Sequence, residues 1–214
     1  MLELSVKTLL AYLLGALLGS LVLGHLRGVD IRRAGSGNAG ATNALRTQGK
    51  LFALAVLVID IGKGVLAILY LPHAALPGVP LDPEIPRAWL TLACGFAVIV
   101  GHVYPVWFGF RGGKGVATMI GVVGALDPRL LLPVIGTWFV VLVLSGYVGL
   151  ASMLAGAALI LFVYVLEPGN TALLCFSAVV ELFVIFTHRG NIARMRAGNE
   201  HRVQLLWLFR SRTA

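Results

Sequence analysis

Long apolar blocks separated by short polar segments run along the whole chain. A helix needs about 20 apolar residues to cross a hydrocarbon core of ~30 Å. The blocks that approach this length are residues 4–26, 51–71, 88–106, 130–146, 148–166 and 171–187. A shorter block, residues 116–126, is followed by Asp127 and Pro128, and it predicts a short tilted helix or a re-entrant segment.

Counting the short block as a seventh crossing decides the topology. With seven crossings, the polar segments that begin at Gly35, Phe110 and His188 lie on one side of the membrane; with six, the third lies opposite the other two. The side with these segments is also rich in Lys and Arg, as cytoplasmic loops are. Its basic residues are Arg27, Arg32, Arg33, Arg46, Lys50, Arg111, Lys114, Arg189, Arg194, Arg196, Arg202, Arg210 and Arg212. The sequence therefore predicts an all-α integral membrane protein. It is expected to be a bundle of seven transmembrane helices, one of them short, with the N-terminus outside and the C-terminus in the cytoplasm.

Composition supports a single membrane domain over residues 1–214. Hydrophobic residues make up 58% of the chain and charged residues 12%, whereas soluble domains have roughly 25% charged residues. A formal charge of +8 would suggest a nucleic-acid partner in a soluble chain. Here the basic residues lie in short loops between apolar blocks, which favours anionic ligands and no nucleic acid. Cys94 and Cys175 fall inside apolar blocks and match neither a disulfide framework nor a zinc spacing, so we expect no metal.

The first polar segment covers residues 35–43, GSGNAGATN, and is closed by Arg46. Glycines let backbone N–H groups turn inward, and Ser, Thr and Asn add short donors, so the segment suits a bound oxyanion. It also matches the dinucleotide pattern G-x-G-x-x-G, with Asp60 at the required distance. That fingerprint must follow a strand in a βαβ unit. This segment follows a membrane span, so we reject the dinucleotide interpretation.

The second polar segment covers residues 110–115, FRGGKG. A Walker phosphate-binding loop would need glycine in place of Phe108, and Ser or Thr in place of Gly115 to bind magnesium. Lys114, flanked by glycines, can still bring its charge and nearby amides to one phosphate. The alternative is a positively charged cytoplasmic turn without a ligand.

The third polar segment runs from His188 to Glu200. His188, Asn191 and Arg194 recur every three residues, so they share one face if the preceding helix continues past Thr187. All three side chains could then donate to phosphate oxygens. The alternative is a capped helix end with solvated charges, in which Glu200 neutralises a neighbouring arginine.

Other ionisable residues lie within or next to the apolar blocks. Asp60 and Lys63 are spaced to pair, so an ion pair and a substrate contact both fit them. Glu181 has no partner evident in the sequence. His25 and Asp30 match H-x-x-x-x-D, the pair with which another acyltransferase class removes a hydroxyl proton, but so short a pattern arises easily by chance.

Taken together, the three polar segments resemble the motif set of the bacterial acyl-phosphate:glycerol-3-phosphate acyltransferases, the PlsY family, in order, spacing and chain length. The resemblance implies that a fatty acyl group passes from a long-chain acyl-phosphate to the 1-hydroxyl of glycerol 3-phosphate. The products are lysophosphatidic acid and phosphate, and neither coenzyme A nor another cofactor is used. The resemblance also implies the first acylation of phospholipid synthesis, in the bacterial inner membrane, with the site facing the cytoplasm. Membrane lipid and the soluble enzyme that makes the acyl-phosphate are the further partners that it suggests. Met195 departs from the family pattern, which usually has leucine there.

The resemblance also implies which residues bind the two substrates. They are Ser36, Gly37, Asn38, Thr42, Asn43, Arg46, Gly112, Gly113, Lys114, Gly115, His188, Asn191 and Arg194. Of these, His188, Lys114 and Arg46 are expected to be catalytic. Either His188 or the substrate's own phosphate could take the hydroxyl proton, and we favour the phosphate.

A transporter for a phosphorylated solute is the alternative outside enzymes. Glycine-rich breaks, a short apolar segment and ionisable residues inside spans would suit it. The sequence contains no evident inverted repeat, and the polar segments gather on one side, so we favour the enzyme.

Overall fold

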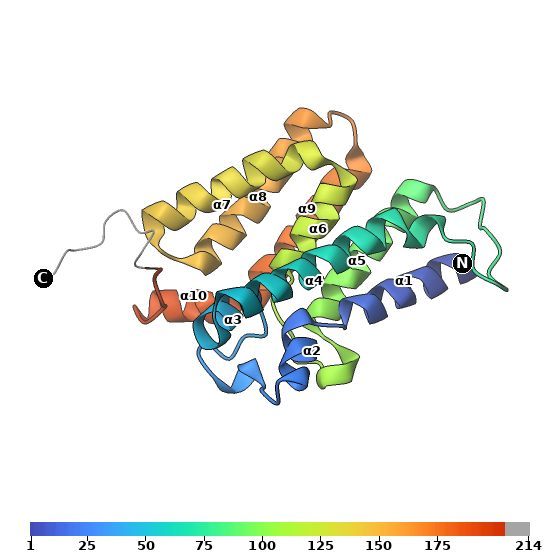
Figure 1. Cartoon of the computed structure of the whole chain (residues 1–214). Helices are drawn as coiled ribbons and strands as arrows, with labels where there is room; N and C mark the ends of the chain where they lie inside the picture. The colour runs from blue at the N-terminus through green and yellow to red at the C-terminus, as the bar shows by residue number, and fades with distance from the viewer. Residues whose placement is uncertain (204–214) are drawn as a thin grey trace, which may run out of the picture. The chain divides into compact units, whose positions relative to one another are not determined.

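The computed structural model describes residues 1–203 and, within this range, contains helices and one isolated bridge between Leu76 and Val79 but no strand (Figure 1). The α-helices are α1 (Leu2–Gly15), α2 (Gly19–Leu26), α3 (Ala41–Gln48), α4 (Lys50–Leu69), α5 (Arg87–Val103), α6 (Val116–Leu126), α7 (Leu131–Ser145), α8 (Val148–Leu166), α9 (Thr171–Thr187) and α10 (Arg189–Arg196). The short 3-10 helices are η1 (Ile31–Arg33), η2 (Leu71–His73), η3 (Val106–Phe108) and η4 (Pro128–Leu130). The prediction of an all-α fold is confirmed for the described residues.

The chain forms two compact units, Met1–Leu126 and Asp127–Ala214. The first unit contains α1 to α6, and the second contains α7 to α10. A single membrane domain over residues 1–214 stays a prediction. Arg210, Arg212 and the C-terminus, which the sequence places in the cytoplasm, lie outside the described residues.

Four described helical segments are long and apolar enough to cross a membrane. They are Lys50–His73, Arg87–Phe108, Pro128–Ser145 and Val148–Leu166. The bent pairs α1 with α2 and α9 with α10 raise the number to six if each pair is one span, and α6 is a shorter apolar helix. Each apolar block of the sequence therefore forms helix, while the count of seven crossings and the sides of the termini stay predictions.

The first apolar block is broken rather than continuous. α1 ends at Gly15 and α2 begins at Gly19, with a bend of 49° between them. α1 packs along α5, and glycines allow the two backbones to approach. A Cβ on Gly15 would collide with the backbone of Val98, and one on Gly101 would collide with the backbone of Tyr12. Small residues thus serve close packing inside this unit.

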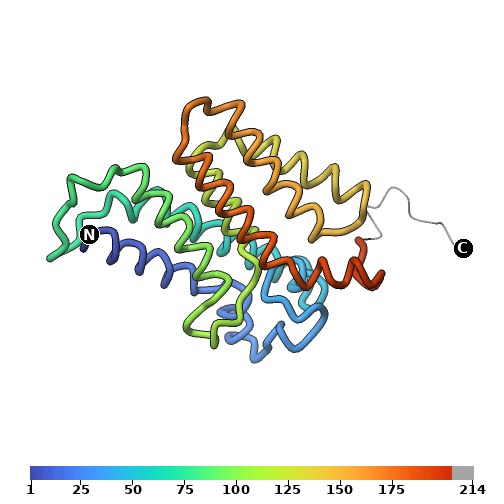
Figure 2. Tube along the Cα trace, turned by 180° about the vertical axis from the view of Figure 1, so that it is seen from behind, coloured from blue at the N-terminus to red at the C-terminus, as the bar shows by residue number. Residues whose placement is uncertain are grey.

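Within the first unit, α4 contacts α1, α2, α3, α5 and α6 (Figures 1 and 2). Its contact with α6 brings two backbones together. A Cβ on Gly64 would collide with the carbonyl oxygen of Thr118, and one on Gly121 would collide with that of Ile61. Because α4 touches so many neighbours, its side chains can reach both the α1–α2 break and the end of α5.

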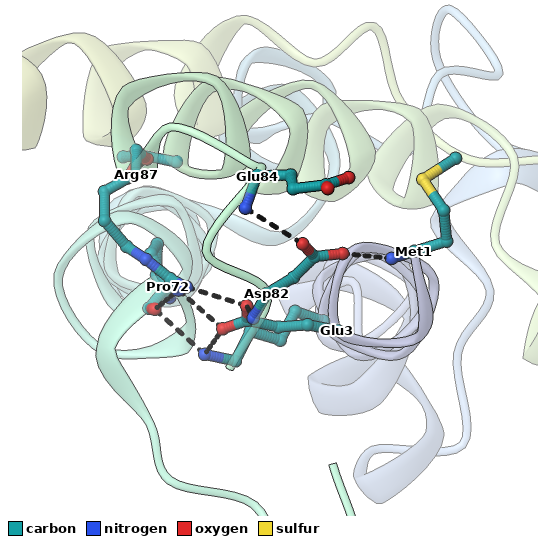
Figure 3. Close-up of polar contacts among 8 residues, drawn as sticks. Met1, Glu3, Pro72, Asp82, Glu84 and Arg87 are labelled. Carbon is teal, nitrogen blue, oxygen red and sulfur yellow. Dashed lines mark hydrogen bonds and ion pairs between the residues drawn. The ribbon is translucent and has the colours of Figure 1, made fainter. Parts of the chain in front are cut away.

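A buried ion network closes the end of the first unit where α1 and α5 begin (Figure 3). Glu3 accepts hydrogen bonds from Lys7 at 2.8 Å and from Arg87 at 2.5 and 2.7 Å. Glu3 also accepts from the amide of Asp82 at 2.8 Å, and Lys7 donates to the carbonyl of Pro72 at 2.9 Å. Glu3 and Lys7 are each 1% exposed. The network ties the proline-rich loop between α4 and α5 to the start of α1.

In the second unit, α8 packs against both α7 and α9 (Figure 2). α8 and α9 approach where Gly156 faces Glu181, because a Cβ on that glycine would collide with the carboxylate. One carboxylate oxygen of Glu181 is buried without a hydrogen-bond partner in the described part of the chain. A glycine on α8 therefore makes room for a carboxylate between two apolar helices.

Candidate functional site

The first polar segment is a loop that Asn43 holds in shape from within. The side-chain oxygen of Asn43 accepts a hydrogen bond from the amide of Ser36 at 2.9 Å. Its Nδ2 donates to the carbonyls of Ile31 at 2.9 Å and Ala34 at 3.0 Å. Asn43 is 1% exposed, and these bonds engage both of its amide hydrogens. The sequence suggests Asn43 as a phosphate donor, whereas in the structure its amide group organises the loop.

Glycines in the same loop adopt conformations that other residues avoid. Gly35 has a φ of +60° and Gly37 a φ of +72°, both in the left-handed region. A Cβ on Gly35 would also collide with the side-chain oxygen of Asn43. From α2, the hydroxyl of Ser20 donates to the carbonyl of Ala39 at 2.6 Å and ties the loop to that helix. The glycines at positions 35 and 37 therefore allow the tight turns of this loop.

The exposed residues of this segment surround the start of α3. Gly40 precedes the helix, Thr42 lies in its first turn and Arg46 lies one turn further on. Ser36, Thr42 and Arg46 are exposed, and the amide of Asn38 lies against Gly40. The amino end of a helix carries partial positive charge and attracts anions. The hydroxyl groups of Ser36 and Thr42 near this end, with the guanidinium of Arg46 in the last turn of α3, suit the binding of a phosphate.

The second polar segment folds back onto the end of α5. The amide of Gly112 donates to the carbonyl of Val103 at 3.0 Å. The amide of Gly113 donates to the carbonyl of His102 at 3.1 Å, and a Cβ on Gly113 would collide with the imidazole of His102. Glycine is therefore required for this close contact, and the contact fixes the backbone that carries Lys114.

Arg32 lies in η1, just before the first polar segment, and binds the second segment and the residues before it. Its Nη1 donates to the carbonyls of Phe108 and Arg111, each at 3.0 Å. Asp30 orients the guanidinium by accepting from Nε at 3.0 Å and from Nη2 at 2.8 Å. The same contact with Arg32 lowers the pKa of the Asp30 carboxyl. No sequence motif marks this role, because Arg32 looks like one more basic residue of a cytoplasmic loop.

The H-x-x-x-x-D pattern does not form a catalytic pair in this structure. His25 is exposed at the end of α2, whereas the carboxylate of Asp30 is engaged by Arg32. A carboxylate that orients a catalytic imidazole must bond to that imidazole. In this structure Asp30 orients Arg32 and not His25.

His188 lies at the bend between α9 and α10, which differ in direction by 52°. Its Nδ1 lies 2.8 Å from the carbonyl oxygen of Val184, so the ring donates from Nδ1 to that carbonyl. Any contact of this ring with a substrate would therefore use Nε2. In the neutral ring Nε2 is an acceptor, as a general base requires.

Glu200 binds the other two polar residues of the third segment. Asn191 Nδ2 donates to Glu200 at 3.0 Å, and Arg194 Nε donates to it at 2.7 Å. The interpretation that Glu200 neutralises a neighbouring arginine is confirmed. The helix does not continue unbroken past Thr187, so the condition for one shared face is not met. Asn191 and Arg194 lie on α10, and His188 lies at its start.

The structure groups the predicted site residues by unit. The first unit holds Ser36, Gly37, Asn38, Thr42, Asn43, Arg46, Gly112, Gly113, Lys114 and Gly115, and the second holds His188, Asn191 and Arg194. Within the first unit, Arg32 connects the two glycine-rich segments. A common site that includes the third segment stays a prediction.

Asp60 and Lys63 form the ion pair that their spacing allows, with 3.0 Å between Asp60 Oδ1 and Lys63 Nζ. The structure adds a third member that no sequence pattern indicates, His102, whose Nδ1 lies 3.0 Å from Lys63 Nζ. A histidine near the end of an apolar block gives no signal of a partner so distant in the chain. Among residues 1–203, no group of three or more His, Cys, Asp or Glu residues could hold a metal ion.

A family model described as Glycerol-3-phosphate acyltransferase matches residues 6–198 of the chain. The glycerol-3-phosphate acyltransferase of Aquifex aeolicus is 40% identical over 193 residues, which cover 90% of this chain and 95% of the relative. That of Synechococcus elongatus is 41% identical over 196 residues, covering 91% and 92%. The chain is also similar to the crystal structure of PlsY (YgiH), an integral membrane glycerol 3-phosphate acyltransferase, in its glycerol 3-phosphate form. The TM-score is 0.79 at 35% identity, covering 93% of this chain and 94% of the other. The lysophosphatidic acid form of PlsY gives a TM-score of 0.78.

Proposed function

Because the chain belongs to the glycerol-3-phosphate acyltransferase family, we propose that it transfers a fatty acyl group from acyl-phosphate to the 1-hydroxyl of glycerol 3-phosphate. The products are lysophosphatidic acid and inorganic phosphate. The observation that carries this proposal is the family match over residues 6–198, which includes the GSGN and GGKG segments and the segment from His188.

Both substrates carry phosphate, so the site must hold two strongly negative groups close together. Such an arrangement is unfavourable unless cations and amide dipoles surround the phosphates. Arg46 and Lys114 supply positive charge in the first unit, in the last turn of α3 and two residues before α6 begins. The hydroxyls of Ser36 and Thr42 and the nearby backbone amides add neutral donors.

The remaining predicted residues divide between binding and support. We assign Ser36, Arg46 and Lys114 to phosphate binding, and Asn43 to holding the Ser36 loop. Gly37, Asn38, Gly112, Gly113 and Gly115 shape the two loops. In the third segment, His188, Asn191 and Arg194 are assigned to the substrates, with Glu200 orienting the latter two.

The reaction needs no covalent enzyme intermediate, because acyl-phosphate is a mixed anhydride with an activated carbonyl and a good leaving group. The hydroxyl oxygen of glycerol 3-phosphate bonds to the carbonyl carbon, and the bond from that carbon to the phosphate oxygen breaks. The hydroxyl proton passes to a phosphate oxygen or to Nε2 of His188, and we favour the phosphate. Orientation of the hydroxyl against the carbonyl then supplies much of the acceleration.

The setting we propose is the bacterial inner membrane, with the polar segments on the cytoplasmic side. Glycerol 3-phosphate enters from water, and the acyl chain of the donor lies among apolar helices next to membrane lipid. The soluble enzyme that makes acyl-phosphate would deliver the donor at this side.

The purified protein in detergent tests the function without any membrane gradient. With acyl-phosphate and glycerol 3-phosphate, we expect lysophosphatidic acid and phosphate in equal amounts, and no product when acyl-coenzyme A replaces the donor. If product formed with acyl-coenzyme A but not with acyl-phosphate, acyl-coenzyme A would be the donor. Absence of product with either donor, together with uptake of glycerol 3-phosphate into sealed vesicles, would favour the transporter instead.

A further inference from the structure

A buried charged cluster joins α4 to the end of α5 in the first unit, next to Gly113 of the second glycine-rich loop. Lys63 Nζ lies 3.0 Å from Asp60 Oδ1 and 3.0 Å from His102 Nδ1, and the latter two atoms are 3.5 Å apart. None of the three residues is more than 3% exposed. Such groups are expensive to bury inside a membrane protein and are retained where they perform a task.

The charges of the cluster are matched to the two helix ends at the α1–α2 break. Lys63 donates to the carbonyls of Gly15 at 2.8 Å and Leu17 at 3.3 Å, where α1 ends. Asp60 accepts from the amide of Gly19 at 3.1 Å, where α2 begins. A cation thus faces a helix carboxyl end and an anion faces a helix amino end, which are the favourable signs. The pair bonds backbone groups that a continuous helix would have bonded internally.

The third member of the cluster faces the lysine-bearing loop. The ammonium group of Lys63 is a donor, so Nδ1 of His102 is the acceptor and the neutral ring carries its hydrogen on Nε2. The same ring lies directly against Gly113, where an added Cβ would collide with Nε2. The carbonyl of His102 also accepts from the amide of Gly113 at 3.1 Å.

We propose that Asp60, Lys63 and His102 are positioning residues for acyl transfer. The cluster sets the direction of α2, which leads toward the loop with Ser36, and His102 forms the surface against which Gly113, the residue before Lys114, packs. One buried network thereby holds both phosphate-binding loops of the first unit in a single arrangement. This inference rests on the proposed function and adds residues that lie outside the three polar segments.

The test measures kcat and the KM for glycerol 3-phosphate for each variant. Size exclusion and the melting temperature in detergent show separately whether the variant is folded. His102→Leu removes the acceptor of Lys63, whereas His102→Asn keeps an acceptor near the position of Nδ1. We expect His102→Leu to lower kcat/KM about tenfold or more at near-normal melting temperature, and His102→Asn to recover much of the loss.

Glycine variants supply the matched comparison. Gly113→Ala places a methyl group against the ring of His102, whereas Gly62→Ala, on α4 next to Lys63, meets no atom within 4 Å. We expect Gly113→Ala to raise the KM for glycerol 3-phosphate and Gly62→Ala to leave the kinetics unchanged.

The ion pair needs a double variant, because Lys63→Met alone leaves the carboxylate of Asp60 buried without its cation and can prevent folding. Asp60→Asn with Lys63→Met restores neutrality, and we expect a folded protein with impaired turnover. Wild-type kinetics in this double variant and in His102→Leu would show that the cluster contributes only to stability, and would overturn the inference. Losses of activity that only follow the folded fraction would overturn it too. A wild-type protein that makes no lysophosphatidic acid would instead contradict the proposed function.

Discussion

The side-chain oxygen of Asn43 accepts a hydrogen bond from the backbone amide of Ser36 at 2.9 Å. With two further bonds from Nδ2 to the backbone, this side chain determines the path of the first glycine-rich loop. Ser36, which we assign to phosphate binding, is thus held in place by the buried side chain of Asn43.

Replacing Asn43 tests this support. Asn43→Ala leaves one amide and two carbonyls without their partner, which we expect to lower the unfolding free energy by about 1–3 kcal/mol and activity by more than tenfold. Thermal unfolding and turnover of the purified variant measure both effects. Gln48→Ala on the same helix is the control and should behave as wild type. An Asn43→Ala enzyme with full activity would show that the Ser36 loop needs no such support.

The carboxylate of Asp30 could either hold Arg32 in place or orient His25 as a base, and variants distinguish these two roles. If Asp30 serves to hold Arg32 against the backbone of the second loop, Asp30→Asn should lower activity while His25→Ala changes it by less than about twofold. Steady-state assays of both variants give the comparison. Loss of all activity in His25→Ala would restore the H-x-x-x-x-D mechanism.

The same pair predicts a pH dependence of stability. Contact with Arg32 lowers the pKa of Asp30 in the folded protein. The stabilisation from its charged form is therefore complete above the ordinary aspartate pKa of about 4 and is lost as the pH falls through the lowered value. Melting temperatures of wild type and Asp30→Asn should differ most at neutral pH and converge in acid. A difference that stays constant with pH would show that the carboxylate charge contributes nothing to stability.

The α8–α9 contact predicts opposite effects for two glycines of the second unit. Gly156→Ala pushes a methyl group into the carboxylate of Glu181, whereas Gly136→Ala on α7 meets no atom within 4 Å. We expect Gly156→Ala to lower the melting temperature and Gly136→Ala to leave it equal or higher. Adding Glu181→Ala to Gly156→Ala should recover part of the loss. No recovery in this double variant would indicate that the methyl group clashes elsewhere.

The apolar blocks predicted the long helices closely, because runs of apolar residues leave few alternatives in a membrane. The break between Gly15 and Gly19 was not predictable from that block. The groups that bond the exposed backbone there belong to Asp60 and Lys63 on another helix, so the break depends on tertiary contacts.

The pairing of charged residues also depends on tertiary contacts that the sequence does not reveal. Nothing in the sequence pairs Arg87 with the start of the chain, yet the structure joins it to Glu3 and Lys7, which are buried. Glu3 and Lys7 lie four residues apart on α1, but Arg87 and Pro72 are distant in the chain, and spacing rules reach only within one helix.

For the candidate site, the sequence identified the residue types and their segments but not the division of tasks. Glycine positions with positive φ were predictable, because few other residues adopt that conformation. The role of Asn43 beneath its loop and that of Arg32 between two loops depend on three-dimensional contacts that no local pattern encodes.

If the glycine-rich loops of the first unit bind the phosphate of the substrate, Lys114 should contribute most of the charge that holds it. The measurement is calorimetric titration of glycerol 3-phosphate into wild type, Lys114→Met and Arg111→Met, with kcat/KM determined on the same samples. Arg111→Met removes a positive charge from the same loop and serves as the control. We expect Lys114→Met to fold normally, bind glycerol 3-phosphate far more weakly and lose about 100-fold or more in kcat/KM, while Arg111→Met stays near wild type. Equal binding and turnover in Lys114→Met and wild type would contradict the account.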